Sequence, residues 1–417
     1  MKVVNQLNVL CLILTVFFLP LHLNLNNIFL VSFISINTIL FFTVDTKNKF
    51  DSLKTNKWSI LLIAIPFLLN ALGLIYTDEP NKASDFTIRA VPFFCLPIIA
   101  VISPQIFLKN YKKFGYALVL GSLVVILYSW ITSIIEIQEL NEPLKDLFGP
   151  LHSHHNLVKA LDLHAAYLSI CIYTAIGFIV TEFKNLNKNM QFVVALTIIL
   201  LSLFMFHLLS RNAIIYYVLA SAVFLVYYKK WKLFIGGFSM VIILAVLAYN
   251  VKHNYLRDRI FNNLNFFEKE TQFSKKDDRF DRLSASYEVF TKRPIIGYGT
   301  AAESKHRREV FKRNKDTIGY ERNLNAHNQF FEYLSTYGVI GGISFIVFFA
   351  FLFFKSFKLK NGFFVYTVSG LFFACLTESV FERSQGVVYT ALIIALMLSF
   401  HLAQKEIKIT KQSAAKT

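Results

Sequence analysis

Cysteine is scarce in this sequence of 417 residues, which contains only four: Cys11, Cys95, Cys171 and Cys375. Each lies within an apolar run, and their separations match neither a disulfide framework nor a metal-binding motif. This pattern argues against a small disulfide-stabilised domain and against a cysteine-ligated metal centre. We expect the four thiols to be small core residues.

Acidic residues are also few, since 26 Asp and Glu stand against 43 Lys and Arg and give a net charge of +17. Such an excess can indicate nucleic-acid binding. Here, however, the basic residues gather in short segments between apolar runs, which is typical of membrane topology. The charge therefore gives no support for a nucleic-acid partner.

Long apolar runs dominate the chain, which is 55% hydrophobic and contains 44 Phe. Several runs reach the roughly 20 residues needed to cross a bilayer. We predict an all-α integral membrane protein with about twelve transmembrane helices. A cleaved signal peptide is an alternative for the first run, but no small-residue cleavage site follows it before the second span. The predicted spans are 8–22, 26–43, 58–76, 89–104, 115–136, 163–181, 191–209, 212–228, 233–250, 328–354, 362–378 and 386–403.

The distribution of Lys and Arg predicts the orientation. With the N-terminus in the cytoplasm, the inside segments hold 20 basic residues and the short outside loops hold 6. The remaining 17 lie in one long outer loop, 251–327. Both termini are thus predicted to be cytoplasmic. The chain divides into helices 1–9 over 1–250, a periplasmic loop domain over 251–327, and helices 10–12 with a tail over 328–417.

Ionisable residues are nearly absent from the middle of the predicted spans, where they would be costly. Under this topology those near the span ends fall on the outer side, which predicts a site at the external membrane face and argues against a path through the bilayer. These residues are Arg89, His164, His207, Arg211, His327, Glu378, Glu382 and Arg383.

His327 lies where the long loop meets the tenth span. We predict that Asn325 caps this helix and places His327 in its first turn. The helix dipole would then disfavour imidazolium, leaving a neutral ring able to accept a proton. Glu332 lies around the helix from His327, so a paired role for these two residues is not expected.

The long loop contains a predicted amphipathic helix, 279–290, followed by the turn 294–299, Pro-Ile-Ile-Gly-Tyr-Gly. Leu283, Tyr287 and Phe290 recur at helical spacing, so they are expected to face apolar surface while the arginines project away. Taken singly, Arg279 and Arg282 are typical of solvated charges.

Other polar residues leave alternatives open. Arg211, in a tight hairpin, suits helix-end anchoring and anion binding equally. His164 suits a hydrogen-bonded histidine between helices. The cluster His152-Ser-His154-His155 fits no strong zinc pattern, so we expect a solvated loop and no metal site.

Three segments, in this order and all predicted to be on the outer side, resemble motifs of the O-antigen ligase/polymerase superfamily of bacterial membrane glycosyltransferases. They are Ser210-Arg211-Asn212; Arg279 with the turn 294–299; and His327-Asn328-Gln329 with Gly338 and Gly341. Two further stretches, 164–169 and 378–386, are similar to a subset of the family. His-Ala-Ala-Tyr in the first departs from a commoner His-Pro-Thr-Tyr form.

This resemblance implies a GT-C type of architecture and an inverting glycosyltransferase that needs neither a metal nor another cofactor. The implied reaction moves a glycan from an undecaprenyl diphosphate carrier to an acceptor hydroxyl at the periplasmic face of the inner membrane, in contact with membrane lipids. A lipid A-core acceptor is favoured. A repeat-unit polymerase and a protein O-oligosaccharyltransferase share the motifs, and a polyprenyl-linked glycan transporter is a more distant alternative.

The resemblance also suggests roles for individual residues. His327 would be the general base, and Arg211 and Arg279 would stabilise the diphosphate leaving group. Arg89, Arg282, Asn328 and His164 are expected to bind substrate. Because Arg279 and Arg282 lie one helical turn apart, either can be the loop arginine, and the spacing to Pro294 favours Arg279.

Overall fold

A computed structural model describes residues 2–208, 211–232, 234–236, 239 and 279–414. The only regular secondary structure in this part of the chain is helical, and it contains no strand. The N-terminal half consists of α1 (Lys2–Phe18), α2 (Leu23–Thr43), α3 (Thr46–Ile63), α4 (Ile65–Tyr76), α5 (Pro80–Ala90), α6 (Pro92–Ile102), α7 (Pro104–Lys109), α8 (Tyr111–Glu139), η1 (Leu144–Phe148), η2 (Asn156–Leu161), α9 (Ala165–Glu182) and η3 (Phe183–Asn185). It is followed by α10 (Lys188–His207), α11 (Arg211–Tyr227), α14 (Arg279–Lys292), α15 (Glu303–Arg313), α16 (Thr317–Arg322), α17 (Gln329–Leu359), α18 (Gly362–Thr377), η5 (Val380–Glu382) and α19 (Ser384–Ala414).

Seven helices of the described chain are long and apolar enough to cross a membrane, and α3 with α4, bent by 70°, can form an eighth span. Three shorter apolar helices, Lys2–Phe18, Ala213–Tyr227 and Gly362–Thr377, coincide with further predicted spans. Most of the predicted span 233–250 lies outside the described residues. An all-helical membrane protein is therefore confirmed, whereas the number of twelve spans stays a prediction.

The helices pack around α9 and α19, in which 78% and 83% of the apolar window is buried, against 28% in the peripheral α10. Polar pairs also join helices inside the apolar region. Asn8 on α1 and Asn37 on α2 exchange side-chain hydrogen bonds of 3.2 and 2.8 Å. Such contacts contribute roughly 0.6–2 kcal/mol between membrane helices. Cys171 and Cys375 are buried as expected, but Cys11 and Cys95 are only partly buried.

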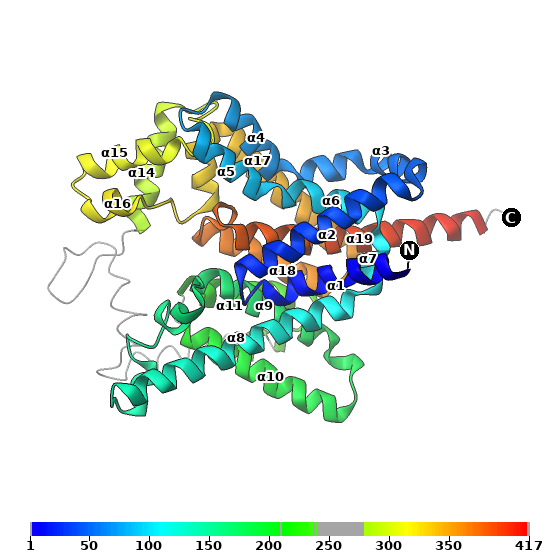
Figure 1. Ribbon diagram of the computed structural model, residues 1–417, viewed down its shortest axis with the longest axis horizontal. Helices are drawn as coiled ribbons and strands as arrows, with labels where there is room; N and C mark the ends of the chain where they lie inside the picture. Colours follow the sequence, from blue (N-terminus) through cyan, green and yellow to red (C-terminus); the bar gives the residue numbers. More distant parts are fainter. Residues whose placement is uncertain (1, 209–210, 233, 237–238, 240–278, 415–417) are drawn as a thin grey trace.

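The loop helices α14, α15 and α16 gather at one end of the molecule, beside α5 and the start of α17 (Figure 1). The beginning of α1 and the end of α19 lie at the other end. The loop helices have a small core of their own, formed by Ala285, Val289, Tyr298, Ala302, Val310 and Phe311. This end of the molecule carries the candidate site.

The Pro-Ile-Ile-Gly-Tyr-Gly turn docks these loop helices onto a kink in α17. Gly338 interrupts α17 with φ 63°, and the N–H of Val339 donates to the carbonyl of Pro294 at 2.7 Å. The N–H of Gly299 donates to the carbonyl of Thr336 at 3.0 Å. A Cβ at Gly338 would lie 2.4 Å from the Ile295 carbonyl oxygen. On the turn side, Gly297 has φ 65° and a Cβ there would lie 2.2 Å from the Thr336 carbonyl oxygen, so the contact requires glycine on both sides.

Candidate functional site

His327 lies just before α17, and the predicted helix start was wrong. Asn328 is the N-cap, because its side-chain oxygen accepts from the N–H groups of Phe330 at 2.9 Å and Phe331 at 3.2 Å. The side chain of Asn325 accepts from the N–H of His327 at 3.2 Å and shapes the preceding turn. His327 has φ 49° and is outside the helix, so the helix-dipole argument does not apply to it as a first-turn residue.

Asn328 uses its polar atoms in the fold. Besides capping α17, its amide donates to the carbonyl of Leu376 at 2.8 Å and so ties α17 to the end of α18. Cap residues of this kind typically contribute about 1 kcal/mol. The structure does not place Asn328 on the wall of the cavity described below.

The imidazole of His327 is paired with a carboxylate that has no assigned role in the sequence prediction. Its Nδ1 lies 2.8 Å from Oε1 of Glu378, whose side chain is only 8% exposed. Burial alone would raise the pKa of Glu378, but His327, His164 and Arg279 together lower that pKa below its usual value. Glu378 is therefore a carboxylate at neutral pH, close enough to Nδ1 of His327 to pair with a charged imidazole.

His164 is the residue just before α9, and its Nδ1 is buried without a hydrogen-bond partner among the described residues, so the expected interhelical hydrogen bond is not found there. Its ring lies 4.5 Å from that of His155 and 5.2 Å from that of Tyr167, measured between centroids. Burial and the neighbouring His155 lower the pKa of His164 to about 4, despite the opposing effect of Glu378. His164 is therefore neutral at physiological pH.

His327, Glu378, His164 and His155 line one cavity of about 580 Å³, here called the cationic cavity. It brings together four of the predicted residues: Arg89, His164, Arg282 and His327. Arg89 is held in place, since its guanidinium donates to the backbone carbonyl of Glu382. The charged and histidine residues of the wall are Lys82, Arg89, His155, His164, Arg282, Glu303, Arg307, Arg322, His327, Glu378, Glu382 and Arg383.

The two loop arginines lie in different places. The predicted helix is confirmed as α14, but its buried face is Arg282, Ala285, Ser286 and Val289, whereas Tyr287 is 54% exposed. The expectation that the arginines project away was therefore wrong for Arg282, whereas Leu283 and Phe290 are partly buried. Arg282, 8% exposed, lies on the cavity wall and is not a solvated charge. Arg279 is near enough to Glu378 to lower its pKa but does not line the cavity.

Arg211 is the first residue of α11, but its side chain lies outside the described part of the structure, as does Ser210. Its predicted role therefore stays a prediction. His207, at the end of α10, has a structural environment. Its Nδ1 accepts from the indole N–H of Trp130 at 3.0 Å, and its Nε2 lies 2.8 Å from the carbonyl oxygen of Leu147.

The histidine-rich loop was predicted to be solvated, and this was wrong for His152. That side chain is 1% exposed, with Nε2 3.1 Å from Glu142 and Nδ1 3.7 Å from Glu136. These contacts hold the loop against the end of α8, and the loop in turn brings His155 to the cationic cavity. The loop therefore helps to position residues of the site.

A buried arginine, Arg307, and three glutamates, Glu303, Glu332 and Glu382, form a network at the wall of the cavity, and sequence reasoning missed it. Arg307 on α15 donates to Glu332 at 2.8 Å and to Ser286 on α14 at 3.1 Å. Glu332 also accepts from the N–H of Ala326 at 2.8 Å, so it supports the segment carrying His327 without touching the histidine. Burial is the main cause that raises the pKa of Glu303 to about 7 and that of Glu382 well above its usual value.

The fold and site together define an all-helical membrane protein with a cationic cavity beside a carboxylate-paired histidine, an arrangement suited to an anionic substrate. The model of the O-antigen ligase family matches residues 196–346, and this confirms the resemblance to the O-antigen ligase/polymerase superfamily. The match includes α14 to α16 and His327 and supports a function of the ligase or polymerase type. No curated protein matches the chain.

Proposed function

We propose that this protein is an O-antigen ligase-like glycosyltransferase. It moves a glycan from an undecaprenyl diphosphate carrier to an acceptor hydroxyl, favoured to be on a lipid A-core oligosaccharide, at the periplasmic face of the inner membrane. The observation that carries the proposal is the His327–Glu378 pair on the wall of a cavity that also holds Arg89, Arg282 and Arg383.

His327 is the general base of the proposed reaction. In the proposed tautomer the ring proton is on Nδ1, the nitrogen nearest Glu378, and the lone pair on Nε2 accepts the proton of the acceptor hydroxyl. The Glu378 carboxylate then stabilises the imidazolium that forms. General-base assistance of this kind typically contributes about 10²–10⁴ in rate.

The arginines stabilise the leaving group. As the acceptor oxygen forms its bond to the anomeric carbon, the bond from that carbon to the diphosphate breaks, and undecaprenyl diphosphate leaves with the electron pair. Guanidinium groups fit phosphate oxygens with paired hydrogen bonds, and fixed cations act strongly in a site with little water. Arg282 and Arg89 serve this purpose from the cavity wall, with Arg211 and Arg279 as further candidates. The chemical step uses no metal.

Direct displacement inverts the anomeric configuration, because the acceptor attacks from the side opposite the diphosphate. His164 is neutral at physiological pH and can exchange hydrogen bonds with sugar hydroxyls. Asn328 acts indirectly, by fixing the start of α17.

The test is transfer by the purified protein in liposomes from an undecaprenyl diphosphate-linked glycan carrying a radioactive sugar. Lipid A-core, a second carrier-linked glycan and a pilin-type protein are offered separately as acceptors. Label on lipid A-core supports the ligase. Label found only in lengthened carrier-linked chains identifies a polymerase, and label on protein identifies an oligosaccharyltransferase.

Two variants test the mechanism in the same assay. His327→Ala and Arg211→Ala are each expected to abolish transfer at normal levels in the membrane. Full activity in either variant would remove that residue from the mechanism. Movement of the lipid-linked glycan across the vesicle membrane without any transfer would instead support a transporter.

A further inference from the structure

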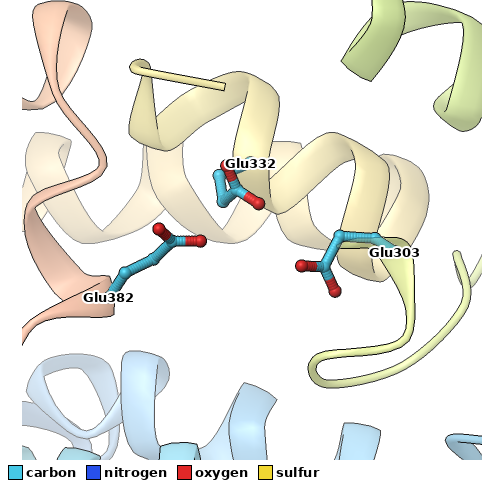
Figure 2. Close-up of side chains that lie close together, drawn as sticks. All are labelled: Glu303, Glu332 and Glu382. Atoms are coloured by element: carbon cyan, nitrogen blue, oxygen red, sulfur yellow. The ribbon is translucent and has the colours of Figure 1, made fainter. Parts of the chain in front are cut away.

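Three carboxylates from separate elements meet at one point beside the cationic cavity. Figure 2 shows Glu303, Glu332 and Glu382 directed toward a common space. They come from the start of α15, the first turn of α17 and η5. One oxygen from each lies within 4.8 Å of the oxygens of the other two. Glu303 and Glu332 are 4% and 3% exposed, so water screens these charges poorly.

The protein supplies one cation to this group. Arg307 lies 2.8 Å from Oε1 of Glu332 and 3.7 Å from Oε1 of Glu303. When all three carboxylates are ionised, the four side chains carry a net charge of −2. A buried excess charge of this size is costly unless a further positive charge compensates it. Protonation of Glu303 and Glu382, whose pKa values are raised, offsets this charge in the absence of an ion, and one divalent cation would offset it equally.

A second, independent feature points into the same place. The cluster lines a small cavity of about 30 Å³, which is enough space for an ion or a water molecule. Tyr333 also lines this cavity and is only 5% exposed. Its hydroxyl has no hydrogen-bond partner among the described residues. One carboxylate oxygen of Glu303 is likewise buried without a hydrogen-bond partner. Unsatisfied buried oxygens indicate that a ligand completes the site.

We propose that this cluster binds one hard divalent cation, Ca²⁺ or Mg²⁺, through Glu303, Glu332 and Glu382. Both ions prefer carboxylate, carbonyl and water oxygens, and two Ca²⁺ ligands at about 2.4 Å on opposite sides of the ion would be about 4.8 Å apart. Tyr333 supplies a further oxygen to the ion or to a water bound on it. The ion would hold α15, α17 and η5 together. This structural role is separate from the proposed function, because the ion takes no part in the transfer chemistry.

The experiment is equilibrium dialysis of the purified full-length protein in detergent micelles with ⁴⁵Ca²⁺, after removal of metals with EDTA and gel filtration. Unlabelled Mg²⁺ as competitor distinguishes the two ions. Thermal unfolding is followed in parallel with and without each ion, because an ion bound only by the folded state raises the Tm. No glycan substrate is present, so failure here is separate from failure of the proposed function.

Glu303→Gln removes one charged ligand, and Glu309→Gln on the same helix, at a carboxylate 65% exposed, is the matched control. The expected result is one ion per chain, a higher Tm with the ion, and a loss of affinity of at least about tenfold in Glu303→Gln only. Tyr333→Phe, a smaller change, is expected to weaken ion binding severalfold. Its affinity for the ion tests the proposal if Glu303→Gln does not fold. Absence of ⁴⁵Ca²⁺ binding and of a Tm rise with millimolar Ca²⁺ or Mg²⁺ in the wild type overturns the proposal. Unchanged affinity in both site variants also overturns it.

Discussion

The Nδ1 atom of His327 lies 2.8 Å from Oε1 of Glu378, and this contact joins the residue before the cap of α17 to the residue that follows α18. The contact places a carboxylate beside one ring nitrogen of the imidazole and leaves Nε2 for the substrate in the proposed reaction. In the proposed reaction, the carboxylate also stabilises the positive charge that His327 gains. Glu378 therefore acts on the reaction through His327.

Glu378→Gln is expected to lower the kcat of transfer by about 10²–10⁴, since the amide keeps the size of the side chain but loses its charge. The KM values for donor and acceptor should change little, because Glu378 acts on the base. The measurement is steady-state transfer in liposomes at matched protein level. Glu309→Gln, exposed on α15, serves as the control and should retain full activity. Activity within twofold of wild type in Glu378→Gln would contradict the assigned role.

The two loop arginines are expected to respond differently to replacement by lysine. Arg282 lines the cavity, so its proposed role requires a guanidinium fork, and both Arg282→Ala and Arg282→Lys should reduce transfer by about 10²-fold. Arg279 acts on Glu378 by its charge, so Arg279→Lys should retain most activity and Arg279→Ala should lose it. Initial rates at several donor concentrations provide the comparison. Retained activity in Arg282→Lys with loss in Arg279→Lys would reverse the two assignments.

The contact between the loop turn and the α17 kink is expected to control stability. Gly338→Ala should lower the Tm and the yield of folded protein, because a Cβ would lie 2.4 Å from the Ile295 carbonyl oxygen at a φ of 63°. Gly236→Ala is the matched control, since a Cβ there meets nothing within 4 Å. Thermal unfolding in detergent measures both variants. Equal Tm values would mean that the loop docks by other contacts.

Local sequence patterns predicted the features that depend on neighbouring residues. Apolar runs predicted membrane helices, and helical spacing followed by a proline turn predicted α14. The same reasoning failed where two adjacent sites have similar local preferences. Asn325 and Asn328 are both good caps, and only the fold directs Asn325 to the N–H of His327 and Asn328 to the start of α17.

Contacts between distant segments were beyond this reasoning. Glu378 stands in a stretch similar to part of the family, but its partner is 51 positions earlier in the chain. The role of Arg307 depends on Glu332, which is 25 positions away and on another helix. Helical periodicity placed Arg282 on the solvent side of α14 because the pattern cannot reveal a polar cavity beneath a helix. Buried charges that face such a cavity look like surface charges in a sequence.

Removing the buried cation of the glutamate network is expected to destabilise the protein strongly. Arg307→Met leaves Glu332 without its partner at 2.8 Å, and such a loss typically costs about 3–5 kcal/mol. The double variant Arg307→Met/Glu332→Gln should recover part of this stability, because the unpaired charge on Glu332 is also removed. Chemical unfolding of the purified proteins measures the difference. Equal stability of the single and double variants would show that Glu332 is compensated by another group.

Protonation of His164 is expected to make the stability of the protein depend on pH in the acid range. Burial and the neighbouring His155 lower its pKa in the folded state to about 4 from the usual 6.5. Between these two values the unfolded chain binds the proton more readily than the folded protein does, so stability falls as the pH drops from 6.5 toward 4 and is unaffected by this residue above 6.5. At pH 5 the expected contribution of His164 is a destabilisation on the order of 1–2 kcal/mol. His164→Gln removes the titrating group, so its Tm should fall less than that of the wild type between pH 7.5 and pH 5. Parallel Tm curves for the two proteins over this range would mean that the pKa of His164 is the same in the folded and unfolded states.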